Sequence, residues 1–305
     1  MSIFMSIVLI LLSVAPVVFF GYLIYEMDFD KEPTSILVRL FLCGIGATFL
    51  TFILTDVLKT IIPFFKNDPG IYSIYQLIPY VFIGIALIEE FSKWIFVYKL
   101  EYNDKEFNHL YDGIVYAAFV SLGFACLENI LYVLKFGAES GVQSGVEVAI
   151  SRAFLAIPGH LCNGIVMGYF LSMAKLAYKE NKKSLSKRKL VLSLLIPTIS
   201  HGLYDYLVMA SSVSNNENLF ILSFYFFIIV FFFFASRKVK QLASNVYNLN
   251  PNYITINQRK KMAKLYTPKE VVDTDIKSNH IDICPNCGHH KVGKYCSGCG
   301  TKLEN

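Results

Sequence analysis

Residues 74–98 read IYQLIPYVFIGIALIEEFSKWIFVY, an apolar run with Glu89, Glu90 and Lys93 inside it. Its length matches the ~20 apolar residues that a membrane-spanning helix requires. A charged group near the bilayer centre costs ~2.5 to 3.5 kcal/mol even on insertion scales, so such groups usually face a cavity lined by protein. This stretch therefore predicts a transmembrane helix that contributes to a polar site, and not one surrounded by lipid.

Further apolar runs on both sides of this stretch predict an all-α polytopic membrane protein with about seven transmembrane helices. Hydrophobic residues form 54% of the chain, charged residues form 17%, and the mean hydropathy is +0.48, which excludes an ordinary soluble globule. The first run has no basic segment before it and no small-residue cleavage site after it, so we expect an anchor and not a signal peptide. The expected spans are residues 3–25, 35–60, 74–98, 112–135, 151–177, 190–212 and 218–236.

Basic residues predict how the chain lies in the cell membrane. Residues 175–189 carry seven lysines and arginines against one acid, and such a loop is retained in the cytoplasm. We therefore expect an external N-terminus and a cytoplasmic C-terminal tail. Because the formal net charge of +5 gathers at membrane edges and not in a separate basic domain, we expect no nucleic-acid partner.

The C-terminal region is predicted to form a structural zinc ribbon. Cys284, Cys287, Cys296 and Cys299 have the spacing C-x₂-C-x₈-C-x₂-C, and four thiolates complete a tetrahedral Zn²⁺ site that has no open position for catalysis. We expect the ribbon to bind a cytoplasmic partner of unknown identity. The predicted organisation is a transmembrane domain at 1–236, a polar linker at 237–279 and the ribbon at 280–305.

Four predicted spans deliver ionisable residues to one depth. Glu89, Glu128, His160 and His201 each fall in the central part of a span when distances are counted at ~1.5 Å per residue. Glu90 follows Glu89 but projects about 100° away from it around the helix, so the two carboxylates are expected to have separate roles. The sequence therefore predicts one polar site between the third, fourth, fifth and sixth spans.

Supporting polar residues are spaced to reach these groups. Lys93 lies three and four residues after the two glutamates, and Asp205 lies four residues after His201, so each pair shares a helix face. Asn163 has the same relation to His160 at a spacing of three, and Asn129 adjoins Glu128. We expect these four residues to orient the catalytic groups or to join neighbouring helices.

Two glutamates and two histidines form a sufficient set for hydrolysis. In one arrangement, Glu128, His160 and His201 bind a second Zn²⁺ with an open position for water, and another glutamate is the general base. In the alternative arrangement no metal is needed, because a glutamate activates water while histidine and asparagine stabilise the oxyanion. The residues alone leave both arrangements open.

The motifs, taken in order, resemble the PrsW family of intramembrane proteases, which is distantly similar to the CAAX prenyl endopeptidase and Abi group. The resemblance covers roughly residues 20 to 235 and includes the acidic connection at 28–33. Its motifs are E-E-x-x-K at 89–93, Asp112-Gly113, Gly123-Phe124, Glu128-Asn129, Arg152 before His160, and H-G-L-Y-D at 201–205.

The resemblance implies an intramembrane endopeptidase that cleaves a membrane-anchored protein. Glu89 and Glu90 would be the catalytic pair, and Glu128, His160 and His201 would be ligands or essential partners. The family's characterised substrate is an anti-sigma factor in stress signalling. The family is usually classed as metallopeptidase, although the related prenyl endopeptidases have been argued to be glutamate peptidases.

Two other functions fit the same residues. Ionisable groups that line an aqueous path also suit a proton-coupled transporter or channel, although the sequence shows no repeated halves of the kind that transporters often have. A noncatalytic membrane scaffold could instead recruit its partner through the zinc ribbon.

Overall fold

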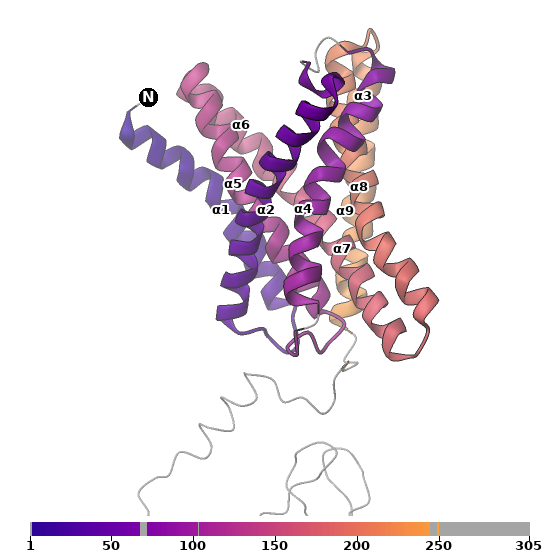
Figure 1. Cartoon of the computed structure of the whole chain (residues 1–305). Coiled ribbons are helices and arrows are strands. Elements are labelled where there is room, and N and C mark those ends of the chain that lie inside the picture. The colour runs from indigo at the N-terminus through magenta and orange to yellow at the C-terminus, as the bar shows by residue number, and fades with distance from the viewer. Residues whose placement is uncertain (1, 68–71, 103, 245–248, 250–305) are drawn as a thin grey trace, which may run out of the picture. The chain divides into compact units, whose positions relative to one another are not determined.

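The computed structural model describes residues 2–67, 72–102, 104–244 and 249, with the chain traced from indigo to orange in Figure 1. Seven helices in this part are long and apolar enough to cross a membrane, which confirms the predicted fold class. They are α1 (Ile3–Glu26), α2 (Thr34–Ile61), the continuous segment α3 to η4, α5 (Asp112–Glu139), α6 with α7, α8 (Lys183–Val213) and α9 (Glu217–Ala243). The predicted zinc ribbon and most of the linker lie outside the described residues.

The third span is not a uniform α-helix. It consists of α3 (Ile74–Val81), the π-helical turn η3 (Phe82–Leu87), α4 (Ile88–Phe96) and a second π-helical turn, η4 (Val97–Glu101). A π-helical turn contains an extra residue, which rotates the side chains that follow it around the helix axis. Both glutamates of the E-E-x-x-K motif follow the first of these turns directly.

The fifth span begins earlier than predicted and is divided into two helices. Instead of starting near residue 151, it comprises α6 (Val142–Phe154) and α7 (Ala156–Lys179), which meet at Leu155. Pro158 lies in the first turn of α7, where its missing N–H group is tolerated but where it cannot continue the hydrogen bonds of α6. The break brings the end of α6 close to the start of α7.

The central helix α5 is held tightly by small residues on both sides. A Cβ atom added at Gly44 of α2 would lie 2.1 Å from the carbonyl oxygen of Val120, and one added at Gly168 of α7 would lie 2.0 Å from that of Gly113. Lipid tails are as apolar as the side chains, so helices in a membrane associate mainly through such close packing. Past these crossings, α5 and α6 diverge from α2, α3, α8 and α9 toward the upper end of Figure 1.

The connection between α1 and α2 buries two carboxyl groups outside the spans. Asp28 is 5% exposed and Glu32 is 4% exposed. Loss of hydration raises the pKa of Asp28 to about 7, with a further contribution from Asp30. Loss of hydration, together with the charges of Asp112 and Asp28, raises the pKa of Glu32 to about 10. Both groups are therefore more easily protonated in the folded protein than in the unfolded chain.

We expect the thermal stability of the solubilised protein to fall as the pH rises. A carboxyl group with a raised pKa stabilises the fold fully below its ordinary pKa, and this contribution is lost as the pH rises through the folded-state pKa. Asp28→Asn should remove the part of the fall between about pH 4 and pH 7, on the order of 5 °C. Glu32→Gln should reduce the part that continues above pH 7. Thermal unfolding at several pH values measures both, and an unchanged pH slope in Asp28→Asn, relative to the exposed control Asp56→Asn, would contradict the assignment.

Candidate active site

The five predicted catalytic residues lie together between four helices. Glu89 and Glu90 come from α4, Glu128 from α5, His160 from α7 and His201 from α8, and all but Glu128 are at most 8% exposed. The imidazole rings of the two histidines are 5.3 Å apart between centroids and perpendicular to each other. The common depth inferred from the sequence therefore corresponds to side chains that contact one another.

Glu90 is enclosed by two partners. Its Oε1 accepts a hydrogen bond from Lys93 Nζ at 2.8 Å and lies 2.8 Å from His201 Nδ1. Lys93 and Glu90 are both 0% exposed, and a buried charge is tolerated only when it is paired and hydrogen-bonded. When Nδ1 of His201 donates to Glu90, Nε2 is left without a proton and faces Glu89 and Asp205.

His160 is held at both ring nitrogens. Its Nε2 lies 2.9 Å from Glu128 Oε2, and its Nδ1 lies 3.1 Å from Lys93 Nζ. Arg152, at the end of α6, donates to the same oxygen of Glu128 from Nη2 at 2.6 Å. Two neighbours thus fix the Glu128 carboxylate at the edge of the site.

Arg152 was not predicted as a site residue, although it is part of the motif order that suggested the family. Besides its bond to Glu128, its Nε donates to Asn129 Oδ1 at 2.8 Å, and its guanidinium lies 4.3 Å from the ring centroid of Tyr132. No helical spacing relates residue 152 to residue 128, since they lie on separate helices. The turn at Gly141, which folds α6 back along α5, brings them together.

The other predicted supporting residues have different surroundings. Asn129 Nδ2 donates to the carbonyl oxygen of Ser13 in α1, so this residue joins α1, α5 and α6. Asp205 Oδ2 lies 3.4 Å from His201 Nε2, as the spacing predicts. Asn163 Oδ1 accepts a hydrogen bond from Ser200 Oγ at 2.6 Å, while Glu128 and Lys93 are the groups that hold His160.

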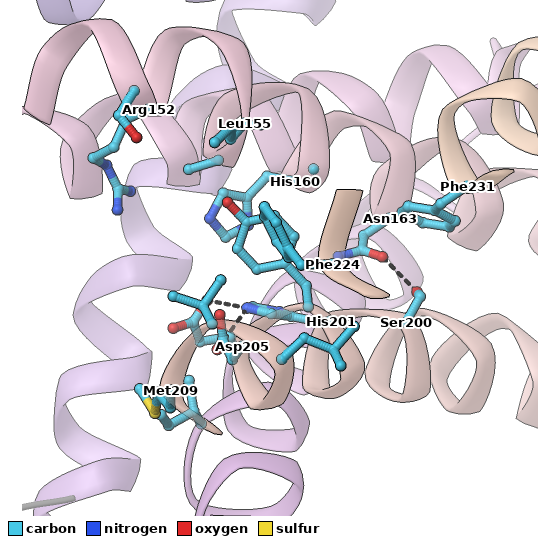
Figure 2. Close-up of a pocket in the computed structure, with 18 of the residues that line it drawn as sticks. Arg152, Leu155, His160, Asn163, Ser200, His201, Asp205, Met209, Phe224 and Phe231 are labelled. Atoms are coloured by element: carbon cyan, nitrogen blue, oxygen red, sulfur yellow. Dashed lines mark hydrogen bonds and ion pairs between the residues drawn. The ribbon is translucent and has the colours of Figure 1, made fainter. Parts of the chain in front are cut away.

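A cavity of about 440 Å³ opens from the site between α6, α7, α8 and α9. Figure 2 shows His160 and His201 from facing helices, with the Asn163–Ser200 hydrogen bond beside them. Glu89, Glu128 and Asp205 also line this cavity, whereas Glu90 does not. Phe224 and Tyr225 of α9 contribute an aromatic wall. The cavity therefore joins ionisable groups to an apolar space between helices.

The donor set of the site suits a divalent metal ion. One ligand atom each from Glu89, His160 and His201 lies within 4.8 Å of the other two, and two histidines with a carboxylate form a common Zn²⁺ site. Among the described residues, the buried Glu89 Oε2 has no hydrogen-bond partner. With neutral histidines, the four site carboxylates, Asp205 included, exceed Lys93 and Arg152 by two formal charges, which a divalent cation would balance.

Comparison with known proteins identifies the family. Residues 32–236 match the model of the PrsW family of intramembrane metalloproteases. The chain belongs to this family. Its relatives include Protease PrsW of Geobacillus kaustophilus, 38% identical over 203 residues that form 66% of this chain and 80% of the relative. Protease PrsW of Bacillus subtilis is 32% identical over 201 residues, 66% of this chain and 82% of that protein. No solved structure matches the chain.

This PrsW family member is thus a membrane-embedded endopeptidase, and its substrates are membrane-anchored proteins. Its family supports neither the transporter or channel hypothesis nor the scaffold hypothesis. The four C-terminal cysteines lie outside the described residues, so the zinc ribbon stays a prediction. The domain boundaries and the external position of the N-terminus also stay predictions.

Proposed function

We propose that this PrsW family member hydrolyses a peptide bond in a membrane-anchored regulatory protein of the anti-sigma-factor type, using the Glu and His residues between α4, α5, α7 and α8. The observation that supports this most directly is the cluster of Glu89, His160 and His201 at the inner end of a cavity between helices. A substrate segment in that cavity would present a peptide bond to the cluster. The anti-sigma-factor class follows from the family resemblance.

Glu89, His160 and His201 would hold the metal ion, and His160 would exchange one of its two ring-nitrogen contacts, to Lys93 or to Glu128, for the ion. When bound, the ion would polarise the scissile carbonyl group and acidify a water molecule. Glu128 is assigned as the general base, because it lines the cavity and its Oε2 is fixed by Arg152 and His160. A base must be oriented as well as near, and these two partners supply the orientation.

Glu90 and Lys93 are assigned as positioning residues. Glu90 does not line the cavity, but its contact with His201 Nδ1 sets which nitrogen of His201 is free. Asn163 lines the cavity and engages Ser200 through Oδ1, which leaves its amide nitrogen to donate to the developing oxyanion. The separate zinc ribbon at 280–305 would bind a cytoplasmic partner and take no part in cleavage.

Co-expression with single-pass membrane reporter proteins tests this function. Wild-type protein should release a shortened reporter, and Glu89→Gln should lower release by about 10³-fold, the effect expected when a central polar group of the site is lost. Glu90→Gln and His201→Ala should also be defective. Glu147→Gln, an exposed glutamate on α6, is the matched control and should cleave normally. Equal cleavage by Glu89→Gln and wild type would show that the catalytic site lies elsewhere.

A further inference from the structure

A second cavity reaches the site from the opposite side of the third span. It has a volume of about 360 Å³ and lies between α2, α3, η3 and α5. Neither His160, His201 nor Asp205 lines it. Its walls instead carry Thr51, Thr55 and Lys59 from α2 and Lys135 from α5.

The two cavities meet at the catalytic carboxylates. Four residues line both of them, namely Ile85, Glu89, Glu128 and Tyr132. The residues of α2 and α5 that line the second cavity follow the close crossing of these helices at Gly44, and α5 diverges from α2 and α3 in that direction (Figure 1). Glu89 and Glu128 can therefore be approached from two directions, and the histidines from only one of them.

Two buried oxygen atoms of residues that line the second cavity have no hydrogen-bond partner within the described residues, and water in the cavity would supply one. Thr51 is 8% exposed, and its Oγ1 is among the buried oxygens without a hydrogen bond in the described part of the chain, as is Glu89 Oε2. Buried polar groups in proteins are almost always hydrogen-bonded, either to protein or to ordered water. Thr51 and Thr55 lie one helical turn apart, so two hydroxyl groups follow one another toward Lys59. Between residues described by the structure, no ion pair involves Lys59 or Lys135.

Hydrolysis inside a bilayer requires such a route. Each cleavage consumes one water molecule, whose oxygen bonds to the carbonyl carbon while the C–N bond breaks. One of its protons passes to the leaving amine nitrogen, and the other stays on the new carboxyl group or ionises from it. The hydrocarbon core does not supply that water. A substrate segment that fills the first cavity, between the aromatic wall of α9 and the histidines, would also exclude water from that side.

We propose that the cavity between α2, α3 and α5 is a water inlet, which delivers the hydrolytic water to Glu89 and Glu128 while the substrate occupies the cavity between α6, α7, α8 and α9. This inference rests on the proposed function, since it assigns the second reactant of the same site. In this role the hydroxyl groups of Thr51 and Thr55 would hydrogen-bond to water in the inlet. Substrate selection would depend on the residues of the other cavity.

Cysteine labelling tests the inlet without using protease activity. Methanethiosulfonate reagents modify the thiolate, which forms in water and not in lipid. Thr55→Cys lines the inlet, whereas Ile53→Cys, two residues away on α2, replaces a side chain that is 61% exposed and does not line it. In the full chain in native membranes, peptide mass spectrometry should show at least about 10-fold faster labelling at 55 than at 53. Equal rates, or no labelling at 55, would overturn the proposal.

A second experiment separates water supply from substrate binding. Thr55→Phe should narrow the inlet and lower kcat about 10-fold, while photo-crosslinking of an uncleaved reporter at the site remains at the wild-type level. Val208→Phe, which narrows the first cavity, should instead reduce crosslinking. Ile53→Phe is the control on the lipid side of α2 and should change neither. The Thr51→Cys/Thr55→Phe double variant shows whether phenylalanine closes the inlet, because closure should protect position 51 from labelling. If position 51 is protected and kcat in Thr55→Phe is unchanged, the inlet is rejected as the source of water. If the reporter is never cleaved, the proposed function fails, and the labelling result still decides the inlet.

Discussion

His201→Ala is expected to remove one metal ion per chain and to lower peptide-bond cleavage by about 10³-fold or more. Within the part of the chain that the structure describes, His201 supplies one of three clustered ligand atoms, and its Nε2 is presented by the hydrogen bond of Nδ1 to Glu90. Alanine removes both the ligand and the partner of a buried carboxylate. His160→Ala and Glu89→Gln should lose the same ion, because each removes another member of the cluster.

Metal analysis of the full-length protein measures this loss. The predicted ribbon should bind its own Zn²⁺, so wild type should hold about two ions per chain. Cys284→Ser should lose the ribbon ion and keep cleavage in detergent, whereas His201→Ala should lose the other ion and keep the ribbon. The Cys284→Ser/His201→Ala double variant should then hold none. An unchanged metal content in His201→Ala would contradict the metal assignment and support a site in which glutamate activates water without a metal.

The sequence was sufficient to predict the number of spans and the common depth of the site. Span length depends on bilayer thickness, and the cost of a charge in lipid makes Glu89, Glu128, His160 and His201 conspicuous. The pairing of Asp205 with His201 follows from helix geometry alone and is present in the structure. Features that depend on a single helix and its surrounding solvent or lipid could therefore be predicted from the sequence.

Features that depend on contacts between two helices could not be predicted from the sequence. Arg152 reaches Glu128 because α6 folds back along α5 after the turn at Gly141, whereas the sequence indicated one continuous fifth span that starts only near residue 151. The separate surroundings of Glu89 and Glu90 were expected from their angle on the helix. Which of them faces the cavity depends on the π-helical turn η3 and on packing against α8, and neither leaves a periodic signal.

The inlet was also beyond the sequence, because Thr51 and Thr55 look like ordinary polar residues of a membrane helix. Hydroxyl groups in such helices commonly bond to the carbonyl oxygen one turn earlier, as Thr48 does with Gly44. Among the described residues, the orphaned Oγ1 of Thr51 distinguishes it from Thr48, which lies nearer the tight crossing at Gly44 and also bonds to the carbonyl oxygen of Phe124 in α5. The proposed role of Thr51 and Thr55 can therefore be recognised only from the cavity that they line between the helices.

Glu128→Gln is expected to keep the metal ion of the site and still lower kcat by about 10² to 10⁴-fold, the range for loss of a general base. Glutamine fills the same space and can accept from Arg152, but it cannot take a proton from water. The ligand variants lose metal and cleavage together, so Glu128→Gln is distinguished from them by its metal content. KM for a reporter should change little, because the walls of the substrate cavity are intact.

Arg152→Lys provides the matched control for this role. Lysine keeps the positive charge near Glu128 but cannot contact Glu128 and Asn129 at once as the guanidinium does. We therefore expect a smaller loss of kcat, about 10-fold, with the metal retained. Kinetics with a purified reporter and metal analysis of the same samples measure both quantities. Release of the site metal in Glu128→Gln would show that Glu128 supports metal binding, either as a ligand or through its contact with His160, and would overturn its assignment as a base that acts apart from metal binding.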